Sequence, residues 1–325
     1  RLATTESDVR SSCWMLRRYT CKSSIECVIA GIMTGDHADK ALARHRLVTE
    51  KRRAAATIAA FMTPSHFSPN ALVISVVSHG HGLAVRSLLY QLAALAQGGA
   101  GPVRRVVLTL NVPEPEPPPP HGGWPFVLQT ICNARPVGFG ANHNRALAGA
   151  TEAFVCVLNP DVELAASDPF GPLAAAAALP GVGCAYPVQR DAQGRPQDSE
   201  RALPTPGALW RRRALRQRES QVDWVNAACL VLPQPVWQAL KGFDEAYFMY
   251  CEDVDLCLRL RLAGLALVRA PAQVVHAGQR ASHRRWAHLQ WHVRSLLRLW
   301  CSPVYRQARQ LLRAPAQGTD NIGPS

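Results

Sequence analysis

A strand, a helix and a second strand follow one another within residues 72–110, and this order constrains the fold more than any other feature of the chain. Residues 72–77 are an apolar run of strand length, and residues 83–96 carry apolar side chains at helical spacing. Residues 103–110 form a second apolar run. Two strands joined by a helix make a right-handed parallel unit, so the sequence predicts an α/β protein.

Polar side chains follow these two predicted strands. Ser78 comes directly after the first strand and Asn111 after the second. Ligands of parallel sheets bind at the carboxyl ends of the strands. We therefore expect Ser78 and Asn111 at a nucleotide-binding edge, where the amide of Asn111 can hydrogen-bond a base.

A carboxylate follows a third predicted strand, residues 153–158. Asp161 comes directly after Pro160, and an acid fixed at the end of a central strand can hold a divalent cation against a diphosphate. Oxygen ligands favour Mg²⁺ or Mn²⁺. The sequence from Asn159 to Asp161 is also an ordinary turn, and both interpretations stay open at this point.

A glycine-rich turn at residues 138–145 opens another predicted helix. Backbone amides of such a turn can bind a phosphate or a dinucleotide. By itself, the pattern is more often a simple tight turn.

Three acids, Glu252, Asp253 and Asp255, lie in the first turn of a predicted helix that ends at Gly264. The helix N-terminus favours ionised carboxylates by about 0.3–1 kcal/mol each, so we expect carboxylates that can accept a proton or bind a cation. His276 ends the apolar run that follows. The competing interpretation is a surface helix with a solvated acidic turn.

The stretch 242–278, GFDEAYFMYCEDVDLCLRLRLAGLALVRAPAQVVHAG, resembles the C-terminal signature of family 2 glycosyltransferases, especially their bacterial rhamnosyltransferase-like branch. Residues 133–146 are similar to the family's N-x-G-F-G-x-x-x-N-x-G segment, and residues 159–164 to an NPD-x-E-L version of its metal-binding D-x-D motif. Residues 222–231 resemble its VDW-x-x-GA-x-L strand. The resemblance covers about residues 72–298.

The resemblance implies a GT-A fold, which is a Rossmann-like mixed sheet flanked by helices, here followed by C-terminal amphipathic helices. It implies metal-dependent, inverting transfer of a sugar, rhamnose or another hexose, from a dTDP- or UDP-linked donor. The expected acceptor is a hydroxyl of a cell-surface polysaccharide, such as O-antigen, or of a lipid-linked glycan.

Individual roles follow from the same resemblance. Asp161 and His276 would hold Mg²⁺ or Mn²⁺, Asp253 would be the general base, and Glu252 and Asp255 would position the acceptor or the base. The donor nucleotide would contact five residues: Ser78, Asn111, Asn144, Arg145 and Asn159. Asp223 and Trp224 would contact the acceptor, with burial in the core as an equal alternative.

The chain departs from the family pattern in four places. Asn111 and Asn159 replace acids, and Ala146 and Ala227 replace glycines. Two other functions therefore stay open: a catalytically degenerate transferase-like membrane scaffold, and another nucleotide-sugar enzyme. The second rests on the glycine-rich turn alone.

Two basic segments lie in the C-terminal half. Residues 211–218 have no periodic apolar face, which predicts a mobile loop that is solvated or that binds an anionic acceptor or lipid head group. Residues 282–313 mix arginines with Trp286, Trp291 and Trp300, as interfacial membrane helices do. Alternatively, these helices pack on the catalytic domain and expose their arginines.

Composition limits where such a protein can work. The chain has 325 residues and a net charge of +13, but it has no nucleic-acid recognition motif. Its apolar runs are shorter than the ~18 residues that span a bilayer, and no signal peptide is visible. The ten cysteines form no CxxC pair, which favours core positions in a reducing cytoplasm. We expect a cytoplasmic protein in peripheral contact with the inner, anionic face of the plasma membrane.

Three regions are expected. Residues 1–65 are an atypical N-terminal extension, either disordered or not native, because three of the four lysines and three of the four methionines fall within residues 1–62. A start near Met62 and a genuine N-terminal region are the two alternatives. Residues 66–280 would form the GT-A domain, and residues 281–325 the basic amphipathic helices and tail.

Overall fold

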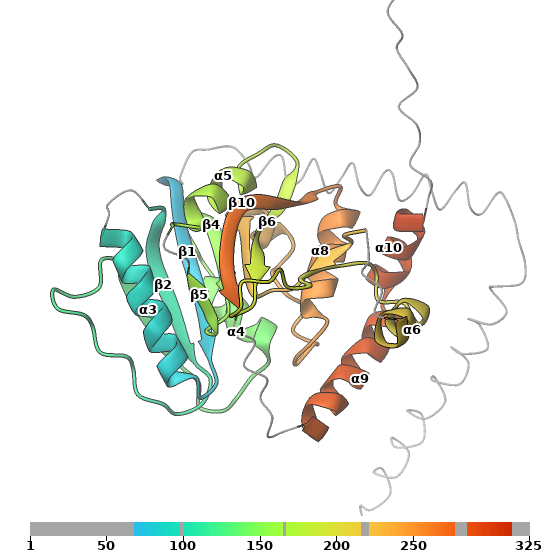
Figure 1. The fold of residues 1–325 in the computed structure, drawn as a ribbon, viewed down its shortest axis with the longest axis horizontal. Helices are drawn as coiled ribbons and strands as arrows, with labels where there is room; N and C mark the ends of the chain where they lie inside the picture. The colour runs from blue at the N-terminus through green and yellow to red at the C-terminus, as the bar shows by residue number, and fades with distance from the viewer. Residues whose placement is uncertain (1–67, 98–100, 165–166, 216–220, 277–284, 314–325) are drawn as a thin grey trace, which may run out of the picture. The chain divides into compact units, whose positions relative to one another are not determined.

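Residues 68–97, 101–164, 167–215, 221–276 and 285–313 are described by the structure, a computed structural model (Figure 1). The predicted extension up to residue 65 and the tail after residue 313 lie outside these ranges. Within the described ranges, no helix is long and apolar enough to cross a membrane.

The main sheet is mixed, as the resemblance implies, and its described part has eight strands in the order β3-β2-β1-β4-β9-β6-β10-β5. The first four of these strands run parallel, whereas β9 is antiparallel to both β4 and β6. The strands are β1 Ser68–Ser78, β2 Val103–Leu110, β3 Val127–Cys132, β4 Glu152–Leu158, β5 Val162–Leu164, β6 Val182–Arg190, β9 Cys229–Pro233 and β10 Ala266–His276.

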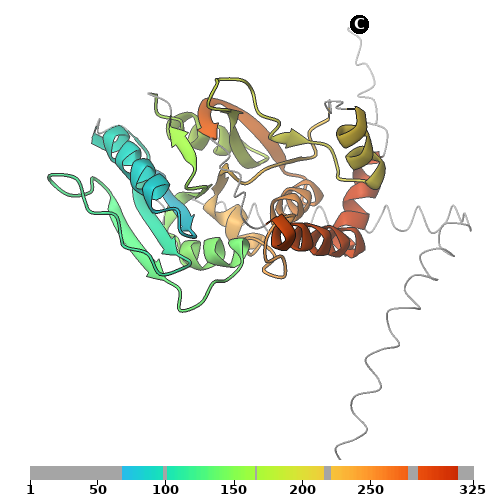
Figure 2. The same ribbon diagram turned by 60° about the horizontal axis from the view of Figure 1, so that its bottom comes forward.

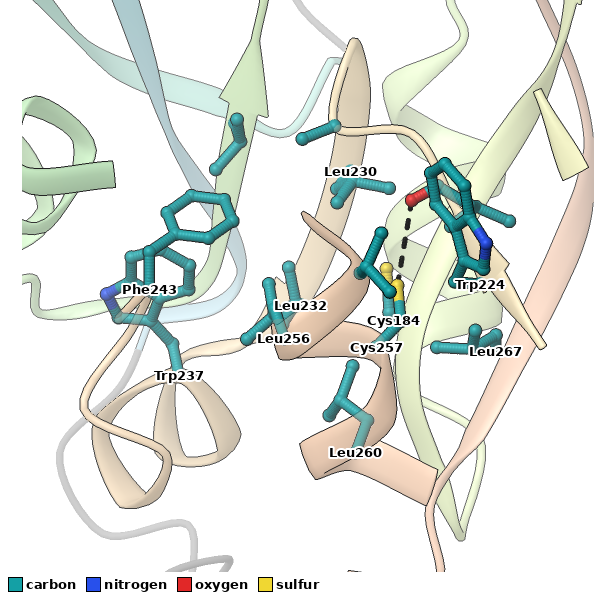
Figure 3. Packing of buried hydrophobic residues seen from close by; sticks show 14 of the residues in the cluster. Cys184, Trp224, Leu230, Leu232, Trp237, Phe243, Leu256, Cys257, Leu260 and Leu267 are labelled. Atoms are coloured by element: carbon teal, nitrogen blue, oxygen red, sulfur yellow. Dashed lines mark hydrogen bonds between the residues drawn. The ribbon is translucent and has the colours of Figure 1, made fainter. Parts of the chain in front are cut away.

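Side chains of the central strands alternate between two cores, as the period of a strand requires. In β4, Phe154, Cys156 and Leu158 join the core under α3 and α5, and Val155 and Val157 join the core under α4, α7 and α8. Figure 3 shows this second core, which extends from Trp237 to Trp224. The helices are α3 Gly82–Gln97, α5 Phe170–Ala177, α4 Phe139–Leu147, α7 Gln234–Ala239 and α8 Glu252–Leu262.

Two C-terminal helices, α9 Arg285–Cys301 and α10 Pro303–Arg313, lie beyond α8 and beside α6 (Figure 2). Leu299, Tyr305 and Ala308 extend the second core between these helices and α8. Trp300 Nε1 and the Tyr305 hydroxyl both donate to the carbonyl of Pro204, at 2.7 and 3.2 Å. The helices are therefore packed on the sheet domain and also leave part of their surface exposed.

The first half of the basic cluster is helical, so the prediction of a loop across residues 211–218 is wrong there. Helix α6 spans Pro206–Leu215, and residues 216–218 lie outside the described ranges. Thr205 precedes the helix, and its Oγ1 accepts a hydrogen bond from the Ala208 amide at 3.1 Å. A threonine cap followed by proline is a strong helix start, and this signal outweighs the missing apolar face.

Helix α8 ends where the sequence predicts. Gly264 has a φ of 78°, and its amide donates to the Arg261 carbonyl at 3.0 Å. The Leu265 amide donates to the Leu260 carbonyl at 3.0 Å. These two bonds define a Schellman cap, for which glycine is the favoured residue.

The glycine-rich turn packs against the loop that leads into α8. The Phe139 amide donates to the Phe248 carbonyl at 2.9 Å. A Cβ atom on Gly138 would lie 2.8 Å from that same carbonyl oxygen, and one on Gly140 would lie 2.7 Å from Cβ of Phe243. These glycines therefore allow two chain segments to approach closely. This approach explains why glycine stands at both positions, and the explanation does not require a bound phosphate.

We expect Gly140→Ala to destabilise the protein by about 1–2 kcal/mol. The added methyl group overlaps Phe243, which is 2% exposed and cannot move aside without disturbing the core; the better helix propensity of alanine offsets about 1 kcal/mol. The matched control is Gly207→Ala in α6, where nothing lies within 4 Å of the added Cβ. Urea unfolding of both variants measures the difference. Equal stabilities would contradict the close approach.

Candidate active site

The ends of the parallel strands bring the predicted nucleotide-binding residues to one edge of the sheet. Ser78 pairs in register with Leu110, and the Asn111 amide donates to the Ser78 carbonyl at 2.8 Å. Strand β4 lies on the other side of β1 and ends at Leu158, directly before Asn159. Parallel pairing therefore places Ser78, Asn111 and Asn159 on neighbouring strand ends.

The side chain of Asn111 is occupied by the protein itself. Its Oδ1 accepts hydrogen bonds from the Val137 amide and from Asn133 Nδ2, both at 2.9 Å. Its Nδ2 donates to the Val137 carbonyl at 3.1 Å and lies 3.2 Å from Nδ1 of His79. The amide thus orders the loop before α4, and its contact with a base stays a prediction.

A chain of amides continues from Asn111 into helix α4. Asn133 Nδ2 also donates to Oδ1 of Asn142 at 2.7 Å, and Arg145 Nη1 donates to Oδ1 of Asn133 at 3.0 Å. Asn142 is fully buried and was not identified from the sequence. Arg145, a predicted nucleotide contact, is therefore fixed at the rim of this network.

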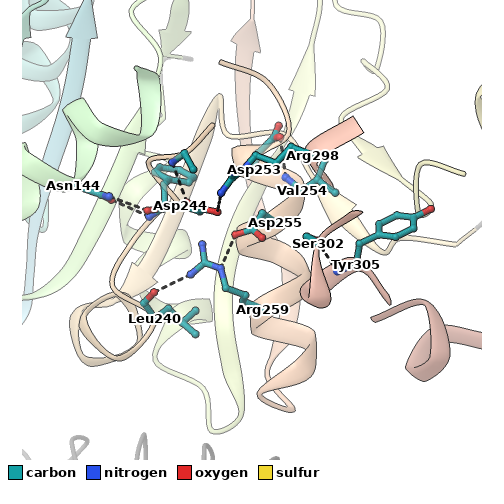
Figure 4. Close-up of polar contacts among 12 residues, drawn as sticks. Asn144, Leu240, Asp244, Asp253, Val254, Asp255, Arg259, Arg298, Ser302 and Tyr305 are labelled. Carbon is teal, nitrogen blue, oxygen red and sulfur yellow. Dashed lines mark hydrogen bonds and ion pairs between the residues drawn. The ribbon is translucent and has the colours of Figure 1, made fainter. Parts of the chain in front are cut away.

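Asn144, the other predicted nucleotide contact in α4, clamps the loop before α8. Its Oδ1 accepts from the Phe243 amide and its Nδ2 donates to the Phe243 carbonyl, both at 2.9 Å (Figure 4). Nδ2 also donates to Oε1 of Glu245 at 3.0 Å. Both polar atoms are used, so the side chain holds the loop, and its contact with a nucleotide stays a prediction.

Asp161 and His276, the two predicted metal ligands, lie side by side. Pairing of β5 with β10 places His276 opposite Val162, and Asp161 Oδ1 lies 3.3 Å from His276 Nε2, with each side chain 17% exposed. Burial alone would raise the pKa of Asp161, but the hydrogen bond and charge of His276, together with the weaker charge of His81, bring that pKa below its usual value.

This pair fits a divalent cation bound with the help of other ligands. Metal–ligand bonds of about 2.1 Å allow two atoms 3.3 Å apart to occupy neighbouring coordination positions. Among the described residues, no three His, Cys, Asp or Glu side chains converge as a metal site. Water and diphosphate oxygens would therefore have to complete the coordination. Asn159 Oδ1 is buried and has no hydrogen-bond partner among the described residues.

Glu252 and Asp253 are the acids whose protonation is most strongly perturbed. Burial raises the pKa of Glu252 to about 8, with a further increase from the charge of Asp253. Burial also raises the pKa of Asp253 to about 6, although its carboxylate accepts a hydrogen bond from the Val254 amide at 2.8 Å. Burial opposes the preference of a helix N-terminus for ionised acids and outweighs it for Glu252, whereas the pKa of Asp253 stays below neutral pH.

Asp255 faces a different direction from this acidic pair. It is 2% exposed, and its Oδ2 accepts from Arg259 Nε at 2.6 Å. Arg259 Nη1 in turn donates to the carbonyl of Leu240 at 2.8 Å, as Figure 4 shows. Asp255 therefore anchors α8 to the end of α7 and contacts neither Glu252 nor Asp253 through a described hydrogen bond.

The two predicted acceptor contacts are buried, so the structure supports the core alternative. Asp223 Oδ2 accepts from the Leu203 amide and its Oδ1 accepts from Gln221 Nε2, both at 2.7 Å. Trp224 is 8% exposed and donates from Nε1 to the Ala202 carbonyl at 2.9 Å. Both belong to the small sheet formed by β7 Glu200–Arg201 and β8 Trp224–Val225.

Histidines near the site were not predicted. His143 in α4 is fully buried, its Nδ1 lies 2.8 Å from Ser75 Oγ, and burial lowers its pKa to about 3. His288 and His292 of α9 contact Tyr250, directly before the acidic helix. The spacing of four residues between His288 and His292 is visible in the sequence and is the signal that could have identified them.

The fold built from these elements is that of GT-A glycosyltransferases, as expected. The chain is similar to a solved structure of the mannosyltransferase PcManGT from Pyrobaculum calidifontis in complex with GDP-Man and Mn²⁺. The TM-score is 0.50, the identity is 16%, and the match covers 84% of this chain and 86% of that one.

Sequence relatives confirm the resemblance to the rhamnosyltransferase branch. The N-acetylglucosaminyl-diphospho-decaprenol L-rhamnosyltransferase of Mycobacterium tuberculosis (strain ATCC 25618 / H37Rv) is 32% identical over 190 residues, which cover 49% of this chain and 62% of the relative. Rhamnosyltransferase WbbL of Escherichia coli (strain K12) is 39% identical over 84 residues, which cover 25% of this chain and 31% of the relative. The chain thus spans less than two thirds of each relative, and no family model matches it.

The raised pKa of Glu252 predicts a pH-dependent stability. Between pH 4.5 and 8 the folded protein holds a proton that the unfolded chain releases, so the free energy of unfolding falls as pH rises across this window. One such proton corresponds to up to about 1.4 kcal/mol per pH unit. Urea unfolding should show this fall reduced in Glu252→Gln and retained in Glu163→Gln, a control at an exposed acid. An unchanged slope in Glu252→Gln would disprove the shift.

Proposed function

We propose that the protein transfers a hexose, with rhamnose the first candidate, from a nucleoside diphosphate donor to a hydroxyl of a glycan or lipid-linked acceptor. The observation that carries the proposal is the 3.3 Å approach of Asp161 and His276. Asp161 lies in the turn between β4 and β5, and His276 ends β10, at the sheet edge where ligands of α/β folds bind. The names of the two relatives support rhamnosyl transfer.

Two side chains of this site would hold a cation. Asp161 offers a carboxylate and His276 an imidazole to Mg²⁺ or Mn²⁺. The bound ion would neutralise the charge that develops on the leaving diphosphate. Ser78, at the end of the neighbouring strand β1, lies where the donor nucleotide would bind. A dTDP or UDP donor fits the expectation from the sequence.

Asp253 is the proposed general base. Its pKa of about 6 leaves it ionised at neutral pH and close to the value at which proton transfer is efficient. It would remove the acceptor proton as the acceptor oxygen attacks the anomeric carbon in line with the departing diphosphate, which inverts that carbon. Glu252, with its pKa of about 8, stays protonated and does not repel the base.

A peripheral position at the inner face of the plasma membrane belongs to the same proposal. A lipid-linked acceptor lies in a bilayer, and α9 and α10 together carry six arginines and no acidic residue. Basic helices of this kind are attracted to anionic lipid. The whole protein would thus meet its acceptor at the membrane surface.

One observation favours a second function, a degenerate transferase that serves as a membrane scaffold. The amide of Asn111 is fully engaged with the loop before α4, and the family has an acid at this position. A scaffold would bind neither donor nor cation, so a binding measurement separates the two functions.

Titration calorimetry with dTDP and UDP, each with and without Mn²⁺, is the first test. We expect Mn²⁺ to strengthen binding of at least one nucleotide, because Asp161 and His276 would hold the cation and its charge would offset that of the diphosphate. Asp161→Asn should lower the affinity measured with Mn²⁺ by at least tenfold and leave the affinity without Mn²⁺ almost unchanged. If neither nucleotide binds under any condition, the scaffold is the better interpretation.

The role of Asp253 predicts a variant that binds its donor but does not turn it over. Asp253→Asn keeps the size of the side chain and its hydrogen bond from the Val254 amide, but an amide cannot accept the acceptor proton. We expect a loss of turnover of at least 10²-fold, the lower range of general base catalysis, with donor affinity within about threefold of wild type. Loss of donor binding in this variant would refute the assignment.

A further inference from the structure

Helix α9 contacts the turn before the acidic pair through one of its faces. His288, His292 and Ser295 are spaced at i, i+4 and i+7, so they share this face. The Tyr250 hydroxyl lies 2.6 Å from Nδ1 of His288, and the Tyr250 ring stacks on His292 at 3.5 Å between centroids. Ser295 Oγ donates to the carbonyl of Met249 at 2.8 Å.

The turn that α9 holds has an unfavourable backbone. Tyr250 and Cys251 have φ values of 71° and 66°, and residues other than glycine adopt such angles at a cost of about 1–3 kcal/mol each unless their surroundings impose them. Glu252 and Asp253 follow immediately. The three contacts from α9 are part of what imposes this conformation, and through it they fix the start of α8.

The opposite face of α9 is apolar and exposed. Trp286, Leu289, Val293 and Leu297 are 80%, 52%, 49% and 55% exposed, and their spacing at i, i+3, i+7 and i+11 places them on one stripe. In a helix with 3.6 residues per turn, this stripe lies about 140° from the face that holds the turn. A single helix thus connects an exposed apolar surface with the turn that precedes Glu252 and Asp253.

Charge indicates what covers this surface. The residues Arg285–Arg313 of α9 and α10 include six arginines and no aspartate or glutamate. A second copy of the chain would bring like charges together, whereas an anionic lipid surface neutralises them and also accepts the tryptophan and leucine side chains. The basic charge of α9 and α10 therefore favours a lipid surface over self-association.

We propose that α9 couples the membrane to catalysis: its apolar stripe docks on an anionic lipid surface, and its His288, His292 and Ser295 face then holds the turn at Met249–Cys251 in the conformation that places Asp253. This inference rests on the proposed function only for the role of Asp253. Ser295, His288 and His292 are positioning residues, because they act on Asp253 through the turn and not on a substrate.

Hydrogen exchange in the presence of lipid vesicles tests the coupling without any need for activity. The full chain is incubated with phosphatidylcholine vesicles that contain, or lack, phosphatidylglycerol. We expect it to bind only the anionic vesicles and, when bound, to exchange the amides of residues 249–252 at least fivefold more slowly. Amides in the buried strand β4 serve as the internal reference.

Two variants separate docking from coupling. Leu289→Gln/Val293→Gln changes exposed residues only, and it should bind anionic vesicles at least tenfold more weakly while keeping its exchange rates without lipid. Tyr250→Phe/Ser295→Ala removes the two hydroxyl contacts; it should bind vesicles like wild type but lose the slowed exchange. Tyr250→Phe/Ser295→Thr, which has a hydroxyl at position 295, should regain part of that response.

Three results would overturn the inference. If wild-type protein does not bind anionic vesicles, it has no docking surface for lipid. Concentration-dependent dimers that disappear in Leu289→Gln/Val293→Gln would show that a second copy covers the stripe. A slowed exchange that persists in Tyr250→Phe/Ser295→Ala would show that α9 does not act through the turn. Each result leaves the nucleotide titrations unaffected, so failure of this inference and failure of the proposed function can be distinguished.

Discussion

The hydrogen bonds between the Asn144 side chain and both sides of Phe243 are the interaction on which the site depends. They join helix α4, at the strand-end edge of the sheet, to the loop that leads into α8. Gly138 and Gly140 let the two segments approach, since a Cβ at either position would meet the loop at 2.8 or 2.7 Å. The Phe139 amide adds a hydrogen bond to the Phe248 carbonyl, so the junction holds the loop that leads into α8 against the glycine-rich turn.

Burial decides the chemistry of the acidic pair once that junction is formed. A carboxylate at a helix N-terminus in water would be easily ionised, but Glu252 is 6% exposed and Oε2 has no hydrogen-bond partner in the described structure. Its pKa consequently rises to about 8, while Asp253 titrates near 6. Two adjacent acids thus differ in protonation at neutral pH, so one can remain neutral while the other accepts a proton.

Local features were predictable from the sequence, and long-range amide contacts were not. Strand β2 and the cap of α8 at Gly264 follow from apolar runs and from a glycine with positive φ. Topology also brought Asp161 and His276 together, because Asp161 directly precedes β5 and β5 pairs with the end of β10. The amides of Asn111 and Asn144 could serve a ligand or the protein equally well, and only the three-dimensional position of their partners decides between the two.

The charges of Asp161 and His276, the proposed cation ligands, also decide how the donor and the ion would bind. Asp161 brings one negative charge and His276 none when neutral, so the protein alone would hold a divalent ion weakly, with most ligands left to water. Diphosphate oxygens would add both charge and ligands, and the ion would in turn strengthen donor binding by the same factor, as linkage requires. The replacement of an acid by Asn159 therefore need not abolish the site. Under the proposed function, the ion would depend on the donor, and the cation site would be complete only when both are bound.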